Sequence, residues 1–185
     1  MGKQGNEADG FSMVELVVVL ALSMVVAAIA IPSAQNLVRT YRLLGDTAAL
    51  SSQLSLARMR AAANFANGQL AFNTSASTYQ AKLCTSGCST AGNWIIDGPL
   101  LRLSPGMSFS YGSISAAAQP QSSIAQTSPV IFNSRGYPVD NAGAATGNNA
   151  IYLTDGQGNY RAITVYADGR IATWRYQASG WRVVK

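Results

Sequence analysis

Histidine is absent from the 185 residues of this chain, and only eight side chains are carboxylates. Histidine is the commonest general base and a frequent zinc ligand, so its absence removes the usual starting point for hydrolytic or metal chemistry. Ser104, Ser110 and Ser134 would lack a base to activate them as nucleophiles. We therefore expect no enzymatic activity, no cofactor and no metal site.

Cysteine is also scarce, because Cys84 and Cys88 are the only two. An isolated pair at this spacing predicts a disulfide in an oxidising compartment, with free thiols as the alternative. Zinc would need about four nitrogen or sulfur ligands, and the chain offers two. The short loop between the cysteines means that the bond would fix a local turn and add about 2 kcal/mol by chain entropy.

Charged residues are sparse as well, at 11% of the chain, and the most informative of them lies within an apolar run. Phe11–Ile31 is 21 residues long and holds one charged side chain, Glu15. At about 1.5 Å per residue a helix of this length spans a bilayer core. A charge there costs roughly 2.5–3.5 kcal/mol, so Glu15 is predicted to be functional and to find its cationic partner outside this segment.

The sequence from Gly10 to Glu15, G-F-S-M-V-E, followed by the apolar run, resembles the class III signal of type IV prepilins and type II secretion pseudopilins. The resemblance implies that a prepilin peptidase cuts between Gly10 and Phe11 and methylates the Phe11 amine. It also implies that Glu15 pairs with the N-terminal amine of a neighbouring subunit during assembly. The expected location is the bacterial inner membrane, crossed once, with the head in the periplasm or outside the cell.

Four segments follow from the pattern of the chain. We expect a leader at 1–10, a transmembrane and assembly helix at 11–32, its amphipathic continuation at 33–67 and a β-rich head at 68–185. Pro32 is expected to kink the helix, since proline removes a backbone donor and crowds the preceding turn. Asn67-Gly68 is the predicted stop signal. The fold class is therefore α+β, with one long N-terminal helix packed on antiparallel sheets.

Beyond Gly68 the apolar pattern has a period of two, which predicts strands. The expected strands are Gln69–Asn73, Tyr79–Cys84, Trp94–Ile96, Leu100–Leu103, Met107–Tyr111, Val130–Phe132, Ile151–Leu153, Tyr160–Tyr166, Ile171–Tyr176 and Trp181–Val184. A two-residue turn at Asp168-Gly169 would place Val165 opposite Ala172 and Ile163 opposite Trp174. Arg175 would then lie on the face opposite to these apolar pairs.

Within the superfamily, the head resembles the H-type pseudopilins and the FimT/FimU-type minor pilins. The resemblance rests on three segments, namely 54–61 at the end of the helix, 131–138 with its F-x-x-x-G pattern, and 163–171 with its Gly169-Arg170 pair. It implies a minor pilin or pseudopilin of a type IV pilus or type II secretion system. Its partners would be other pilin or pseudopilin subunits, the prepilin peptidase and the inner membrane.

An alternative function concerns DNA, because cations alternate with aromatic residues near the C-terminus. Phosphate contacts and base stacking use such residues, and some FimT-type minor pilins are associated with DNA capture through a G-R motif. The candidate DNA contacts are Arg161, Arg170, Arg175 and Arg182. The opposing interpretation is that the aromatic residues pack in the core and the arginines line a solvated edge. A DNA-binding minor pilin for DNA uptake is thus the second hypothesis.

Overall fold

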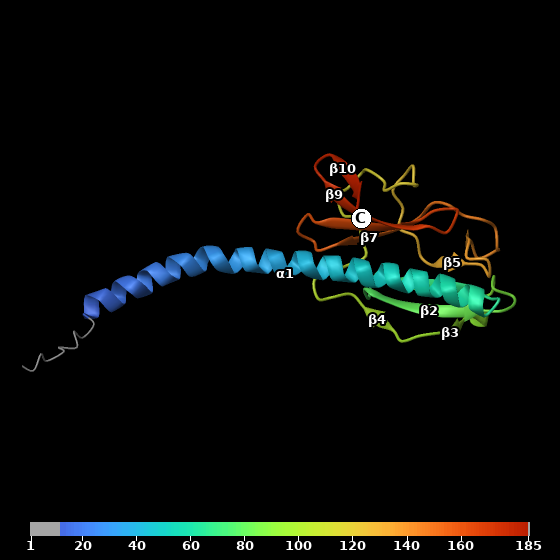
Figure 1. Cartoon of the computed structure of the whole chain (residues 1–185), viewed down its shortest axis with the longest axis horizontal. Helices are drawn as coiled ribbons and strands as arrows, with labels where there is room; N and C mark the ends of the chain where they lie inside the picture. Colours follow the sequence, from blue (N-terminus) through green and yellow to red (C-terminus); the bar gives the residue numbers. More distant parts are fainter. Residues whose placement is uncertain (1–11, 185) are drawn as a thin grey trace, which may run out of the picture. The chain divides into compact units, whose positions relative to one another are not determined.

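The computed structural model describes residues 12–184. The predicted leader and the Gly10–Phe11 cleavage site lie outside the described residues. The chain forms two compact units, Met1–Val38 and Arg39–Lys185, which we describe separately. Figure 1 shows the long helix α1 and the strands that follow it along the chain.

The described part of the first unit is helical. Helix α1 begins at Met13 and continues to Ala63, and every residue from 12 to 38 is exposed to solvent in the isolated chain. An 18-residue window of α1 has a mean hydropathy of 2.8, so the helix is long and apolar enough to cross a membrane by length and composition. Exposed apolar surface of this extent requires lipid or another helix to cover it.

The second unit contains two antiparallel sheets, which confirms the predicted α+β fold class. The six-stranded sheet has the order β3-β2-β1-β5-β6 with β4 also paired to β2, and the four-stranded sheet has the order β10-β9-β8-β7. The elements are β1 Asn67–Asn73, β2 Thr78–Cys84, η1 Ala91–Asn93, β3 Ile95–Ile96, β4 Leu101–Arg102, β5 Val130–Phe132, β6 Pro138–Val139, β7 Asn149–Thr154, β8 Tyr160–Val165, β9 Ile171–Gln177 and β10 Gly180–Val183.

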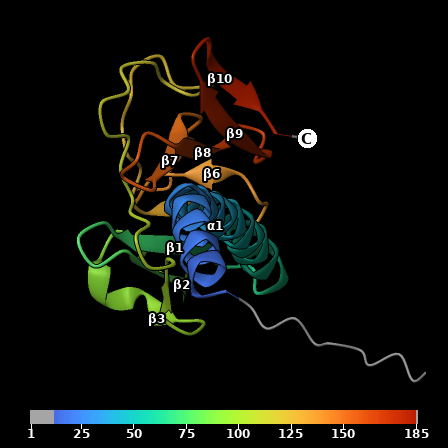
Figure 2. The same ribbon diagram turned by 90° about the vertical axis from the view of Figure 1, so that its left-hand side faces the viewer.

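The main core lies between α1 and both sheets. Every third or fourth residue on one face of the helix is buried, as its amphipathic pattern predicts, and this face packs on side chains of β1, β2, β5, β7 and β8. Figure 2 shows α1 with β1 and β2 on one side and β7 and β8 on the other. The helical members of this core are Leu43, Leu50, Leu54, Ala57 and Ala61. A second cluster on the other face of the four-stranded sheet contains Tyr152 and Trp174. Both faces of that sheet are therefore covered.

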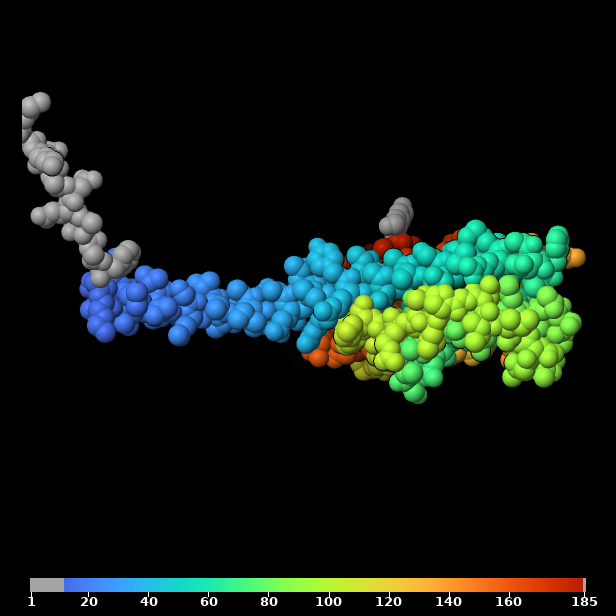
Figure 3. All heavy atoms as spheres, turned by 90° about the horizontal axis from the view of Figure 1, so that it is seen from below, coloured from blue at the N-terminus to red at the C-terminus, as the bar shows by residue number. Residues whose placement is uncertain are grey.

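A segment between β3 and β5 is fixed along α1 at two points. Arg60 forms an ion pair with Asp97 at 3.0 Å and also donates to the Asp97 carbonyl oxygen. About four turns toward the N-terminus, the Asp46 carboxylate accepts hydrogen bonds from the backbone amide and the hydroxyl of Ser104, both at 2.9 Å. Figure 3 shows the chain around residues 95–105 lying alongside the helix. Two helical side chains thus hold a segment that has little regular structure of its own.

The structure differs from the predicted elements in three places. Helix α1 ends at Ala63 instead of near residue 66, because the chain turns at Phe65 before the predicted Asn67-Gly68 stop. Met107–Tyr111 forms no ladder, and within it only Ser108 makes a bridge, to Thr154. The short strand β6 was not predicted, since Pro138-Val139 is too brief to show a period of two.

Phe65 ends α1 in an unusual way. Its φ of 49° lies in the left-handed region that normally favours glycine. The Ala66 amide donates to the Ala61 carbonyl at 3.0 Å, which is the closing hydrogen bond of a Schellman turn. The Phe65 side chain is 88% exposed, so packing within the described chain does not compensate for this conformation.

We expect Phe65→Gly to raise the free energy of unfolding of the second unit by about 0.5–1 kcal/mol, because glycine adopts this φ without steric cost. The measurement is the thermal midpoint of the full chain in detergent. Ala63→Gly is the matched control, since Ala63 is exposed in the last helical turn, and there glycine should lower the midpoint. A lower midpoint for Phe65→Gly would show that the side chain, and not the backbone, decides stability at this turn.

Candidate functional site

Glu15 lies in the first turn of α1 and is exposed, as are the apolar side chains around it. Met13 and Val14 before it and Leu16 after it are each more than half exposed. Residues 11–38 contain no lysine, arginine or histidine. A carboxylate in such a segment has no cationic partner within residues 11–38, so its partner must come from another part of the chain or from another molecule.

Two neighbouring predictions concern the same helix. Gly10 and Phe11 lie outside the described residues, so cleavage and methylation stay predictions. Pro32 lies inside α1, which continues on both sides of it. The predicted kink also stays a prediction.

The predicted disulfide is present between Cys84 and Cys88, and no free cysteine remains. It closes the turn after β2. The Trp94 indole donates a hydrogen bond to the Cys88 carbonyl at 3.0 Å, which ties the η1 segment to the same turn. The bond acts locally, as the short spacing predicts.

The predicted register of the β8–β9 hairpin is wrong by one residue. Val165 pairs with Ile171, Thr164 with Ala172 and Ala162 with Trp174. The reason is the loop, which has three residues instead of two: the Tyr166 amide donates to Arg170 and the Gly169 amide donates back to Tyr166. A three-residue loop with glycine in the left-handed region is the next commonest hairpin connection.

This shift moves every side chain of β9 to the other face. Arg175 lies directly opposite Arg161, on the face that carries the core residues Ile163 and Val165. The predicted opposite-face position of Arg175 is therefore wrong, although its side chain is exposed. Trp174 packs on the second cluster and donates from its indole to the Thr164 hydroxyl at 2.8 Å.

The four arginines proposed for DNA contact separate into two places. Arg161 pairs with Arg175, and Arg175 pairs with Arg182, so these three form one line across β8, β9 and β10. We call them the arginine row. Arg170 lies instead at the hairpin loop, where its guanidinium is 3.9 Å from the centre of the Tyr166 ring and 3.9 Å from the Asp168 carboxylate. Contact with DNA stays a prediction for all four.

Within the arginine row, the three side chains differ in exposure. Arg175 and Arg182 are exposed, and Arg182 donates to the Ser179 hydroxyl at 3.2 Å. Arg161 is only 8% exposed. Burial holds the pKa of the Arg161 guanidinium below its usual value, and the positive charge of Arg175 lowers it further.

The sequence did not predict that Gly136 and Gly169, two motif glycines far apart along the chain, contact each other and the side chain of Arg58 on α1. Gly136 ends the F-x-x-x-G segment, and Gly169 precedes Arg170. A Cβ at Gly169 would lie 2.3 Å from the Gly136 carbonyl oxygen, and a Cβ at Gly136 would lie 2.8 Å from the Arg58 guanidinium. Arg58 donates to the Gly169 carbonyl at 3.0 Å. The motif residues thus have a packing role here, which only the spatial contact reveals.

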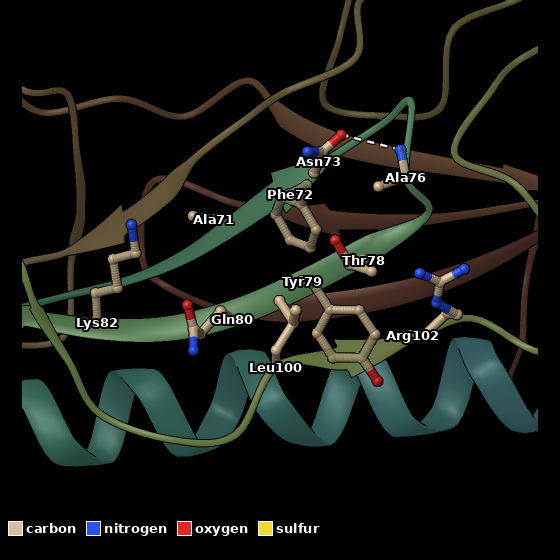
Figure 4. A pocket seen from close by; sticks show the side chains of 10 residues that line it. All are labelled: Ala71, Phe72, Asn73, Ala76, Thr78, Tyr79, Gln80, Lys82, Leu100 and Arg102. Carbon is tan, nitrogen blue, oxygen red and sulfur yellow. Dashed lines mark hydrogen bonds between the residues drawn. The ribbon is translucent and has the colours of Figure 1, made fainter.

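A cavity of about 420 Å³ lies over the strands β1 and β2 beside β4 (Figure 4). Its lining contains two cations, Lys82 and Arg102, and no carboxylate or thiol. The labelled residues are Ala71, Phe72, Asn73, Ala76, Thr78, Tyr79, Gln80, Lys82, Leu100 and Arg102. Among residues 12–184, no group of three or more metal-ligating side chains converges.

The comparisons with known proteins agree with the N-terminal signal. Residues 6–31 match the family described as the prokaryotic N-terminal methylation motif. The match supports the predicted relation to the type IV pilin and pseudopilin superfamily. A search of curated proteins found no match.

Two solved structures of the minor pseudopilin EpsH from the type II secretion system of Vibrio cholerae are similar to this chain. One is 10% identical with a TM-score of 0.38, covering 77% of this chain and 96% of EpsH. The other is 11% identical with a TM-score of 0.39, covering 77% and 93%. Such a loose superposition transfers no feature of EpsH to the residues described above.

Proposed function

We propose that this chain is a minor pilin or pseudopilin, a structural subunit assembled from the bacterial inner membrane into a type IV pilus or a type II secretion pseudopilus. Prepilin peptidase cuts between Gly10 and Phe11 and methylates the new amine. Residues 11–32 hold the subunit in the membrane and, after assembly, pack against the helices of other subunits. Residues 33–67 connect this anchor to the head at 68–185, which faces the periplasm or the cell exterior.

One observation carries the proposal: Glu15 is the one carboxylate in the exposed apolar stretch 12–38, and it lies within the methylation motif. An unpaired charge is costly in a bilayer. A neighbouring subunit cleaved at the same place supplies an amine at the depth of Glu15, because that amine and the carboxylate belong to the same short segment. The electrostatic pair then forms between subunits and favours assembly.

Glu15→Gln should test this pairing, because it removes the charge and keeps the shape. We expect incorporation into filaments, or co-purification with partner subunits, to fall at least tenfold, while the thermal midpoint of the head stays within about 1 °C. The reason for the second expectation is that every core residue of the head lies at or beyond Leu43.

Ser23→Ala is the matched control, since Ser23 is an exposed polar residue of the same helix whose hydroxyl bonds only to the Val19 carbonyl. It should assemble normally. Equal incorporation of Glu15→Gln and the wild type would contradict the pairing and, with it, the assembly role of Glu15.

A DNA-binding minor pilin is the second candidate, and the arginine row is the observation that favours it. Three cations on adjacent strands could contact successive phosphates. Arg170, the residue that maps onto the G-R motif, is however separated from the row and contacts its own loop. The filament subunit is therefore the primary proposal.

A further inference from the structure

The arginine row is a line of like charges on one face of the four-stranded sheet. Arg161 lies opposite Arg175 on β9, and Arg175 lies opposite Arg182 on β10. Directly opposed residues on neighbouring strands are about 5 Å apart at Cβ and share a face. Like charges in such positions repel one another and destabilise the sheet unless an anion lies among them.

No anion within the described chain balances this row. Arg161 is 8% exposed and forms no hydrogen bond or ion pair from its side chain among residues 12–184. Asp155, the closest carboxylate along the chain, is occupied by its own turn, where it accepts from the amides of Gln157 and Asn159 and from the Asn159 side chain. The guanidinium nitrogens of Arg161 are not fully buried, so the row is a line of cations that an anion from outside the chain can reach.

Within the second unit, the row lies away from the C-terminal end of α1. Arg58, near the C-terminal end of α1, contacts Gly169 in the β8–β9 loop. Arg161 is four residues before Val165, where β8 meets the loop, and the rise of a strand makes this about 13 Å. Figure 1 shows β9 and β10 toward the start of the unit, away from the C-terminal end of α1. Arg39 and Arg42 begin that same stretch of helix.

Aromatic side chains accompany the row on the other face of the same strands. Tyr176 lies edge-on to Tyr160 and to Trp181, with ring centres 6.2 Å and 5.2 Å apart. Tyr41, on α1 between Arg39 and Arg42, is 61% exposed. Tyr176 and Trp181 therefore lie on a different surface of the sheet from the arginine row.

We propose that the arginine row binds the phosphates of anionic phospholipid headgroups and holds the head on the membrane surface before the subunit is assembled. This rests on the proposed function, because the anchor keeps the head close to the bilayer. Arg39 follows Pro32, the end of the apolar run, by seven residues. The membrane anchor keeps the arginine row at a high local concentration of headgroups, so a few contacts are enough to hold the head on the membrane surface. The unit from Arg39 onward has twelve basic and five acidic side chains, a net charge of +7.

Lipid fits the position of the row better than DNA does. The three cations span only three strands, and Arg170, which would extend the contact, lies at the other end of the β8–β9 hairpin. Negatively charged headgroups instead lie within reach of the anchored chain at all times. Each arginine close to an anionic leaflet improves binding about fivefold.

The test is hydrogen exchange of the full chain reconstituted in vesicles of phosphatidylcholine alone or with about 30% phosphatidylglycerol. We expect the amides of 171–183 to exchange at least about fivefold more slowly in the anionic vesicles, and the difference to disappear at high salt, where charges are screened. Arg175→Gln with Arg182→Gln should abolish the difference. Both side chains are exposed, so the thermal midpoint should hold.

Arg102→Gln with Arg135→Gln is the matched control, since it removes the same charge from exposed arginines outside the row. It should keep the protection. Equal protection in both kinds of vesicle, or equal loss in both double variants, would overturn the proposal. A third result would also overturn it: the variant with Arg175→Gln and Arg182→Gln, solubilised in detergent, no longer retards duplex DNA, while its hydrogen exchange in vesicles is the same as that of the wild type. The vesicle experiment uses the reconstituted chain, which needs neither cleavage nor a filament. Normal incorporation of Glu15→Gln into filaments would therefore contradict the proposed function without changing the result expected in vesicles.

Discussion

Replacement of Gly10 by leucine is expected to leave the chain uncleaved. In cells with active prepilin peptidase, mass spectrometry of the wild-type membrane fraction should show a chain that begins at methylated Phe11. Gly10→Leu should yield the full Met1–Lys185 chain, with mature protein reduced at least a hundredfold. The reason is that a peptidase of this kind accepts little or no side chain before the cut, so that Gly10→Ala should be partly processed and a bulky residue should not be.

Gly5→Leu is the matched control for this change, because it adds the same side chain to the same leader five residues before the cut. It should be processed normally. Recovery of the intact chain from the wild type would remove the whole processing argument. Normal cleavage of Gly10→Leu would show that the peptidase does not recognise this glycine.

Gly169→Ala is expected to give the largest loss of stability among single methyl additions to the head. The new Cβ would lie 2.3 Å from the Gly136 carbonyl oxygen, and both partners are backbone, so one hairpin must move. The movement also disturbs the 3.0 Å bond from Arg58 to the Gly169 carbonyl. We expect the free energy of unfolding to fall by roughly 3 kcal/mol or more, measured by denaturant titration of the full chain in detergent.

Gly143→Ala separates this collision from simple backbone strain. Gly143 has a φ of 86°, close to the 77° of Gly169, but a Cβ there would have nothing within 4 Å. Its substitution should cost only the left-handed strain of an L-residue, about 1–2 kcal/mol. Equal losses in the two variants would mean that the contact between the two hairpins adds nothing to stability.

The local features of this protein could be predicted from its sequence because each depends on neighbouring residues. Glu15 is conspicuous since nothing near it can neutralise a charge, and the helix and most strands follow from apolar periods. The Cys84–Cys88 bond joins residues four apart, so no long-range information was needed. Helix α1 ended earlier than expected because Phe65, which is not a typical stop residue, adopts the left-handed conformation.

The arrangement of the head was decided by tertiary structure. One extra residue in the β8–β9 loop reversed the faces of β9, and this brought Arg175 opposite Arg161 instead of away from it. Gly169 in that loop packs against Gly136 and Arg58, which are distant in the sequence. The sequence by itself determined the anchor, its single carboxylate and the α+β class through local periodicity. The arginine row and the glycine contact arose only when separate hairpins packed on α1, because contacts between distant residues leave no periodic signal.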